Sequence, residues 1–132
     1  LVKLGRLAAA RPHLDLALTV ARELGNPQAE GLWLGGLGGL HLRGERLTAA
    51  QACFDQALER LSHPGGERFR LSVLPNLVRL CLRRGDLSRA REVLDEANAL
   101  ADAVALGPGS VTAVDLAEVR ERVANIQSLP TR

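Results

Sequence analysis

Histidine and cysteine are the side chains best suited to acid, base, nucleophilic or metal chemistry, and this 132-residue chain has few of them. They are scattered along the sequence as His13, His41, His63, Cys53 and Cys81. No Ser/His/Asp or Cys/His arrangement and no pair of carboxylates stands at a repeated spacing, as a catalytic centre would need. Closely spaced Cys and His ligands for zinc are missing too. We therefore expect no enzyme, no metal and no cofactor.

Arginine is the other residue type with strong binding chemistry, and Lys3 is the only basic residue that is not Arg. The guanidinium group pairs with carboxylates and phosphates through parallel hydrogen bonds. Because the formal net charge is only +2, nucleic-acid binding would need a local patch with aromatic side chains for base stacking. The densest patch contains Phe69 as its only aromatic residue, so we expect a partner other than nucleic acid. This basic patch comprises Arg68, Arg70, Arg79, Arg83 and Arg84.

The apolar run at residues 31–42 is the longest in the chain and is too short to cross a membrane. No signal peptide opens the sequence, and the two isolated cysteines are typical of small buried side chains. We expect a cytoplasmic protein that does not enter membranes. The sequence starts at Leu1 without Met, so we also expect it to be trimmed or excised from a longer protein.

Helices must position these residues. Leu and Ala abound while aromatic residues make up 2% of the chain, a composition that favours helix over strand. A shift of forty residues aligns small, large and small side chains on one helical face: Ala10, Ala50 and Ala90; Leu14, Phe54 and Leu94; Ala17, Ala57 and Ala97. The pattern predicts six helices, over residues 6–24, 27–43, 46–62, 67–84, 87–105 and 110–128.

Several residues between the predicted helices have turn and capping character. Gly5, Gly44 and Gly85 stand in the short turns, where a positive φ is needed. Asn26 before Pro27 and Asp86 are typical helix caps, and Thr48 with Gln51 offers a capping box. We expect the third helix to start with that box.

The best repeat fills a family pattern with Leu74, Leu77, Val78, Cys81, Gly85, Ala90, Leu94 and Ala97. The pattern resembles the tetratricopeptide repeat, which places these residue types in two antiparallel helices. In the preceding repeat Gly44 comes one residue early, so its first helix can be aligned on either Trp33 or Leu34. The forty-residue period is similar to that of repeats in bacterial signalling and transcription regulators.

The resemblance implies an all-α, right-handed α-solenoid of antiparallel helical hairpins in one domain. The divisions that we expect are a partial repeat at 1–26, repeats at 27–66 and 67–107, and a capping helix with a tail at 108–132. It also implies that ligand-facing residues lie on the first helix of each hairpin. These are Ser72, Asn76, Arg79 and Arg83 in the clearest unit, and either Trp33 or Leu32, together with Arg43, in the preceding one.

Arg and Asn side chains in this arrangement can bind a carboxylate or the backbone amides of an extended peptide. The alternative is that these residues form an ordinary solvated helix face. The glycine-rich segment 31–40 lacks the strand and spacing of a phosphate loop. Its glycines indicate either close packing of helices or a groove that admits a ligand.

The ends of the array differ. Leu116, Val119, Val123 and Ile126 form one narrow apolar stripe, typical of a terminal capping helix. The first helix has no preceding partner helix, so we expect missing upstream sequence or, as the second choice, a homo-dimer to cover it. The leading hypothesis is a non-catalytic scaffold or regulatory module that binds a protein or peptide segment. The alternatives are a structural or oligomerisation segment and a sensor fragment of a larger bacterial transcriptional regulator.

Overall fold

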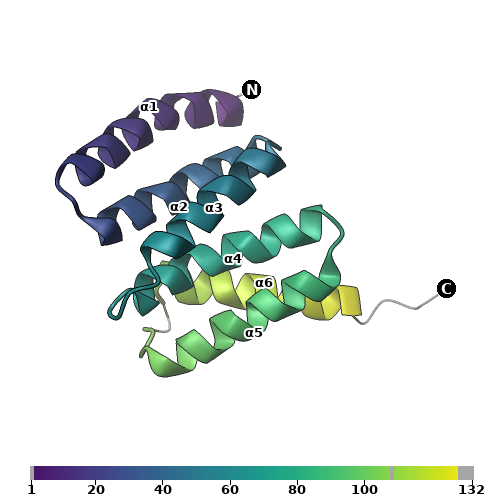
Figure 1. Ribbon diagram of the computed structural model, residues 1–132. Helices are drawn as coiled ribbons and strands as arrows, with labels where there is room; N and C mark the ends of the chain where they lie inside the picture. Colours follow the sequence, from purple (N-terminus) through teal and green to yellow (C-terminus); the bar gives the residue numbers. More distant parts are fainter. Residues whose placement is uncertain (1, 108, 128–132) are drawn as a thin grey trace. The chain divides into compact units, whose positions relative to one another are not determined.

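A computed structural model describes residues 2–107 and 109–127, and it is helical throughout these ranges except at the connections (Figure 1). The helices are α1 (Val2–Glu23), α2 (Pro27–Arg43), α3 (Leu47–Arg60), α4 (Glu67–Arg83), α5 (Leu87–Ala103) and α6 (Val111–Gln127). These six confirm the helices that the periodicity predicts. Residue 1 and residues 128–132, which include the last predicted helical residue and the predicted tail, lie outside the described residues.

The chain divides into two compact units, and the division falls inside α4 between Val73 and Leu74. In the first unit, α2 packs against both α1 and α3. Its core includes Leu34, Leu37 and Leu40 of α2 with Phe54 of α3, all buried. In the second unit, α5 packs against α6, and the core includes Leu74, Leu77, Ala90, Ala97 and Leu116.

Backbone turns recur every twenty residues. The positive φ values occur at Gly25, Glu45, Gly65 and Gly85, between +61° and +94°. The expected turn glycine is therefore correct at Gly85 and wrong at Gly44, whose φ is −83°. Glu45 adopts the left-handed conformation instead, because it occupies the position forty residues before Gly85. The backbone keeps the repeat spacing even where glycine lies one residue away.

The cap predictions had mixed outcomes. Asn26 accepts a hydrogen bond from the Ala29 amide at 3.1 Å, and Asp86 accepts one from the Arg89 amide at 3.0 Å, as expected. The Thr48–Gln51 box is wrong, because α3 starts at Leu47 and Gln51 donates instead to Asp55 at 2.9 Å.

The predicted turn at Gly5 is also wrong. Helix α1 is continuous from Val2, so Gly5 lies inside a helix. A single glycine there costs only about 1 kcal/mol relative to alanine, which a long helix can absorb. The stripe of α6 is confirmed for Leu116, Val119 and Val123, which are buried, while Ile126 is 38% exposed.

Candidate functional site

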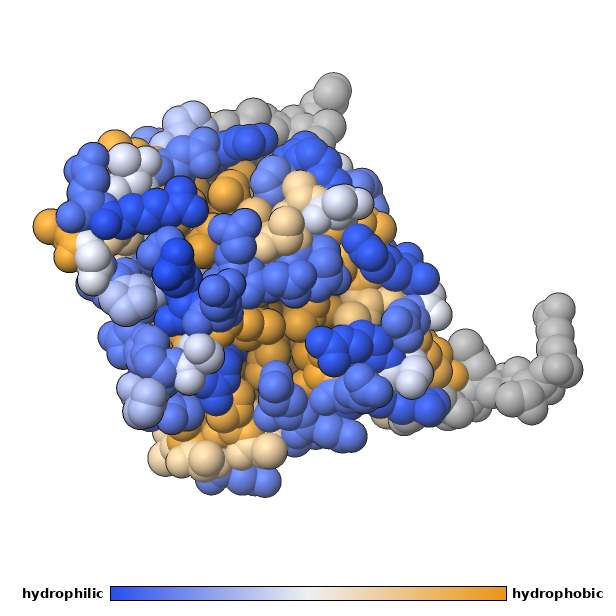
Figure 2. All heavy atoms as spheres, in the orientation of Figure 1, coloured by the Kyte–Doolittle hydropathy of each residue, from blue (hydrophilic) through white to orange (hydrophobic). Residues whose placement is uncertain are grey.

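An apolar groove of about 390 Å³ lies between α1 and α2 in the first unit. The side chains of Leu16 and Leu24 on its rim are 64% and 74% exposed. Figure 2 shows apolar surface among polar side chains near the α1–α2 turn. The groove is lined by His13, Leu16, Ala17, Val20 and Ala21 of α1, by Leu24 and Asn26 of the turn, and by Ala29 and Trp33 of α2.

Helical periodicity explains the two faces of α1. Leu18 and Ala21 are buried, and Leu14 packs against the cluster formed by Leu37, Leu40 and Cys53. Residues 16 and 17 each lie three or four positions from residues 13 and 20, and residue 24 lies four beyond residue 20, so these residues share the face that borders the groove. Sequence reasoning identified only Trp33 of these lining residues. The signal that could have identified the others was the apolar stripe along α1.

Trp33 and Leu34 settle the alignment of the second repeat. Leu34 is buried, as is Leu74 forty residues later, while Trp33 is half-buried and lines the groove. The repeat is therefore aligned on Leu34. Trp33 lines the groove, and its role as a ligand-facing residue stays a prediction.

The glycines of α2 form a packing surface. A Cβ atom added to Gly31 would lie 2.5 Å from Cγ of Leu61, and one added to Gly35 would lie 3.0 Å from Cγ2 of Val73. A side chain at Gly31 would require Leu61 to shift, and one at Gly35 would be tightly crowded by Val73. Of the two interpretations of the glycine segment, close helix packing is the one that the structure supports for these positions.

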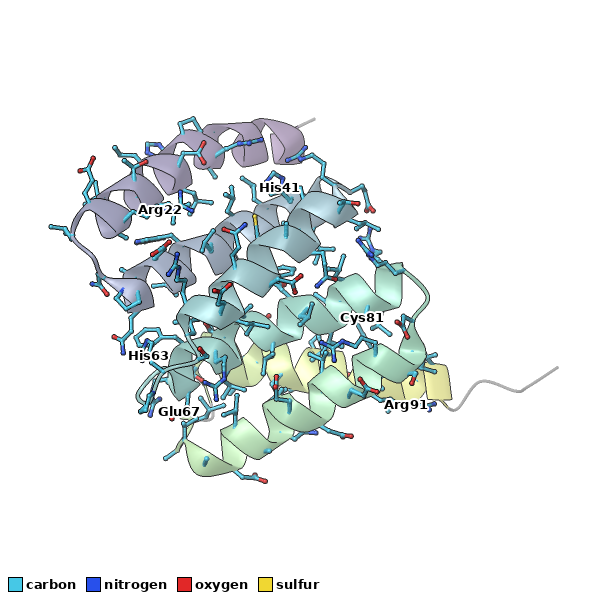
Figure 3. All side chains as sticks on the ribbon, viewed as in Figure 1. Arg22, His41, His63, Glu67, Cys81 and Arg91 are labelled. Carbon is cyan, nitrogen blue, oxygen red and sulfur yellow. The ribbon has the colours of Figure 1, made fainter. Side chains whose placement is uncertain are left out.

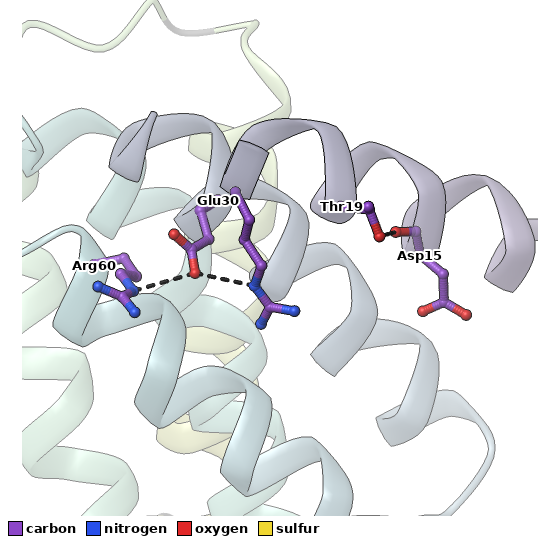
Figure 4. A network of polar contacts seen from close by, with 5 residues as sticks. Asp15, Thr19, Glu30 and Arg60 are labelled. Atoms are coloured by element: carbon purple, nitrogen blue, oxygen red, sulfur yellow. Dashed lines mark hydrogen bonds and ion pairs between the residues drawn. The ribbon is translucent and has the colours of Figure 1, made fainter. Parts of the chain in front are cut away.

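A carboxylate joins the three helices of the first unit near one end of the groove. Glu30 of α2 is 9% exposed, and one of its oxygens lies 3.2 Å from Nε of Arg22 in α1 and 3.2 Å from Nε of Arg60 in α3 (Figure 4). A buried carboxylate needs such partners, because desolvation disfavours its charge. This network holds the last turn of α1, which precedes Leu24, against α2 and α3.

His41 occupies the opposite end of α2 (Figure 3). Its Nδ1 accepts a hydrogen bond from Nε of Arg46 at 2.9 Å, and the residue is 6% exposed. Burial lowers the pKa of His41 below its ordinary value; Arg46 and Arg11 lower it further, and Asp15 opposes them. His41 is thus the core histidine that the repeat pattern predicts. Burial raises the pKa of both the Cys53 and Cys81 thiols, as expected for inert buried side chains.

The other candidate residues fall in both units. Arg43 at the end of α2 is exposed, and Ser72 donates a hydrogen bond to the Phe69 carbonyl inside α4. In the second unit, Asn76 is half-buried and Arg83 is exposed. The groove therefore contains only Trp33 from the predicted set.

Arg79 is held by an internal network in the second unit. Its Nη2 lies 3.0 Å from Asp115 and 3.2 Å from Glu118, both on α6, and its Nη1 donates to Asn76 at 2.9 Å. The side chain of Arg79 is only 17% exposed. A partner carboxylate at this position would have to compete with two carboxylates of the chain itself.

Other kinds of site have little support among the described residues. No three His, Cys, Asp or Glu side chains there are grouped to hold a metal ion. Within the described ranges, no helix is both long and apolar enough to cross a bilayer. In the basic patch, Arg70 donates to the Leu61 carbonyl at 3.0 Å and Arg79 binds α6, so both side chains are engaged within the chain.

Comparison with known proteins gives one family and one fold neighbour. A model of the tetratricopeptide repeat matches residues 1–63. No curated protein matches the chain significantly. Among solved structures, the chain is similar to BtubC (BKLC) from P. vanneervenii, with 20% identity and a TM-score of 0.69. The match covers 97% of this chain and 61% of that chain, so this chain spans about three fifths of that structure's length.

At this identity the structural match establishes the fold alone. Together with the six helices of the described residues, it confirms the expected all-α solenoid of helical hairpins. The repeat pattern, the turns spaced by twenty residues and the family model agree in the first unit. Residues 1–63 therefore match the tetratricopeptide repeat family.

Proposed function

We propose that this chain is a non-catalytic scaffold or regulatory module that binds a protein or peptide segment, with the groove between α1 and α2 as its main contact surface. Repeats of the tetratricopeptide family generally mediate protein binding. The observation that carries the proposal is the groove itself: about 390 Å³, apolar, rimmed by Leu16 and Leu24 and floored by Trp33. Apolar grooves with aromatic anchors favour peptide side chains.

The polar residues form a second part of the proposal. Arg43 and Ser72 in the first unit and, separately, Asn76, Arg79 and Arg83 in the second unit would each contact carboxylates or backbone amides of a partner. For Arg79, this requires displacement of Asp115 or Glu118. Glu118→Gln should therefore strengthen any contact that Arg79 makes with a partner, while Arg79→Glu with Arg83→Glu should abolish it.

The proposed location is the cytoplasm, as part of a bacterial signalling or scaffolding assembly. Cys53 and Cys81 are both free and buried, as expected where thiols stay reduced.

The chain provides its own reporter for a binding test, because Trp33 is its only tryptophan and lines the groove. Peptides selected from a displayed library that contains both helical and extended sequences, and no Trp, would be titrated into the chain while Trp33 emission is recorded. Leu16→Lys puts a charge on the groove rim at an exposed position and should weaken binding about tenfold or more. Thr19→Lys is the matched control on the same helix, because Thr19 is exposed and does not line the groove.

Equal affinity for Leu16→Lys and Thr19→Lys would show that the groove is not the binding surface. A second candidate function is oligomerisation, which the exposed Leu16, Val20 and Leu24 side chains favour. Sedimentation at increasing concentration separates the two. Self-association that Leu16→Lys abolishes would support the oligomerisation segment in place of the peptide-binding module.

A further inference from the structure

Helix α2 packs against a surface formed by α3 and the first turns of α4, which we call the seat. Gly31 of α2 faces Leu61, Gly35 faces Val73, and Gly38 faces Phe54. At the start of the helix, Nε2 of Gln28 donates to the carbonyl of Gly65 at 3.4 Å. These contacts run along the whole face of α2 and lie within the first unit.

The groove between α1 and α2 is the counterpart of this seat one repeat earlier. A shift of forty residues converts the seat residues Cys53, Ala57, Leu61 and Val73 into His13, Ala17, Ala21 and Trp33, all of which line the groove. Burial differs between the two places. Ala57 is completely buried beneath the helices around it, whereas Ala17 is half-buried.

We infer that the groove receives an amphipathic α-helix from a partner protein, seated on α1 and α2 in the way that α2 is seated on α3 and α4. This inference rests on the proposed function and specifies its ligand. The groove continues an interface that the chain already uses, and its apolar lining matches a helix with one apolar stripe.

Differences between seat and groove define the side chains of the partner helix. Ala21 replaces Leu61, so the groove has room for a large apolar side chain where α2 has Gly31. Trp33 replaces Val73, so the position equivalent to Gly35 must be glycine. Leu14 replaces Phe54 in the repeat. It packs against the cluster of Leu37, Leu40 and Cys53 and does not line the groove, so the repeat alone indicates that the position equivalent to Gly38 can hold a medium side chain.

The second unit supports the last of these substitutions. Forty residues after Gly38 and Phe54 stand Val78 and Leu94, and both are buried. In the second unit, therefore, the position equivalent to Gly38 holds valine, and the position equivalent to Phe54 holds leucine. The expected stripe of the partner helix is a large apolar residue, glycine four residues later, and valine three residues after that.

A second copy of the chain does not offer such a helix within the described ranges. Apart from Gly5, the glycines inside helices all belong to α2, where Gly31, Gly35, Gly38 and Gly39 are buried in the chain's own core. A partner helix with this stripe therefore fits the groove better than any described helix of a second copy.

Two synthetic peptides test the pattern. The first has the sequence of residues 27–43 with Gly31→Leu, Leu32→Lys, Trp33→Gln, Gly36→Ala and Gly38→Val, the Lys, Gln and Ala serving solubility and helicity. The second adds Gly35→Leu. Each carries a fluorescent label, and binding to the full chain is followed by anisotropy. The first peptide should bind, and the second should bind at least about tenfold more weakly, because leucine would overlap Trp33.

Reciprocal variants of the chain identify the contacts. Trp33→Ala removes the ring that the leucine of the second peptide would overlap, so it should restore binding of that peptide. Ala21→Leu places leucine at the position equivalent to Leu61. It should weaken binding of the first peptide about tenfold and should favour binding of a peptide that keeps Gly31. Circular dichroism shows that each variant folds, and either variant alone suffices for the test.

Four outcomes would overturn the inference. They are equal affinities of the two peptides, binding that neither Trp33→Ala nor Ala21→Leu changes, absence of binding, and dimerisation of the chain through this groove in sedimentation. If library-selected extended peptides change Trp33 emission while neither helical peptide binds, the proposed function stands and the helix inference falls. If no peptide of either kind binds, both fall.

Discussion

The aromatic ring of Phe54 lies where a side chain of residue 38 would start. A Cβ atom on Gly38 would be 2.5 Å from Cε1 of Phe54, and Phe54 is completely buried. The absent side chain on α2 and the large one on α3 therefore fit each other. The packing of the first hairpin depends on this pair.

Gly38→Ala should destabilise the chain, because overpacking costs about 1 to 3 kcal/mol. The higher helix propensity of alanine offsets about 1 kcal/mol of this cost. Gly36→Ala on the same helix is the matched control. A Cβ atom there would lie 3.3 Å from the flexible end of Leu14, so this variant should be neutral or up to about 1 kcal/mol more stable. Urea unfolding measures both, and Phe54→Leu should rescue Gly38→Ala. A Gly38→Ala protein as stable as Gly36→Ala would contradict the tight fit.

Glu30→Gln should lower the free energy of unfolding by about 1 to 2 kcal/mol, because Arg22 and Arg60 lose a charged hydrogen-bond acceptor that is largely buried. Asp15→Asn removes the carboxylate of an ion pair with Arg11 in which both side chains are about half exposed. Such surface pairs contribute about 0 to 1 kcal/mol and weaken in salt. Chemical unfolding at low and high salt should show a larger and less salt-sensitive loss for Glu30→Gln than for Asp15→Asn. The reverse order would contradict the bridging role of Glu30.

Stability should decrease as the pH falls below the ordinary histidine pKa of 6.5, because the pKa of His41 is lowered in the folded chain. The unfolded chain then binds a proton more readily than the folded one, so the stability contribution is complete above that pKa and is lost as pH falls toward the folded value. His41→Cys, which copies the equivalent Cys81, should flatten the unfolding free energy between about pH 7 and about pH 5. His13→Asn, at an exposed position, should retain the slope. A slope that His41→Cys leaves unchanged would assign it to other groups.

Gly85→Ala should destabilise the chain by about 1 kcal/mol, because residue 85 has a φ of +73° that alanine adopts poorly. Gly44→Ala should have little effect, since its φ is −83° and a Cβ atom there meets only the flexible guanidinium of Arg46. Thermal unfolding of the two variants makes the comparison. A larger loss of thermal stability in Gly44→Ala than in Gly85→Ala would indicate that Gly44, and not Glu45, is the left-handed residue of that turn.

Periodicity and caps were enough to predict the six helices, because the burial of one helix face and the capping hydrogen bonds both depend on residues that are close in sequence. The error at Gly44 arose from treating glycine as the marker of the turn. The position of the turn is fixed instead by the repeat: Arg46 and Asp86 each donate a backbone hydrogen bond five residues back, to His41 and Cys81.

The candidate site was predictable only in part. Trp33 was identified through the family pattern, but the residues of α1 that complete the groove belong to a different helix and repeat. The network of Arg22, Glu30 and Arg60 joins three helices, and no local pattern links residues at such separations. Arg79 was expected to face a ligand, and its contacts with α6 depend on where a later helix packs.

The turns at Gly25, Glu45, Gly65 and Gly85 have a consequence for how such a chain can change length. A helix and its turn together occupy twenty residues. Along the chain, however, helices that pack on a seat, such as α2, alternate with helices that form a seat, such as α3. A tandem duplication of residues 27–66 would therefore preserve every seat and its occupant. Duplication of half that length would place a seat-forming helix where an occupant belongs, so growth of the array by whole hairpins is the only kind that its packing tolerates.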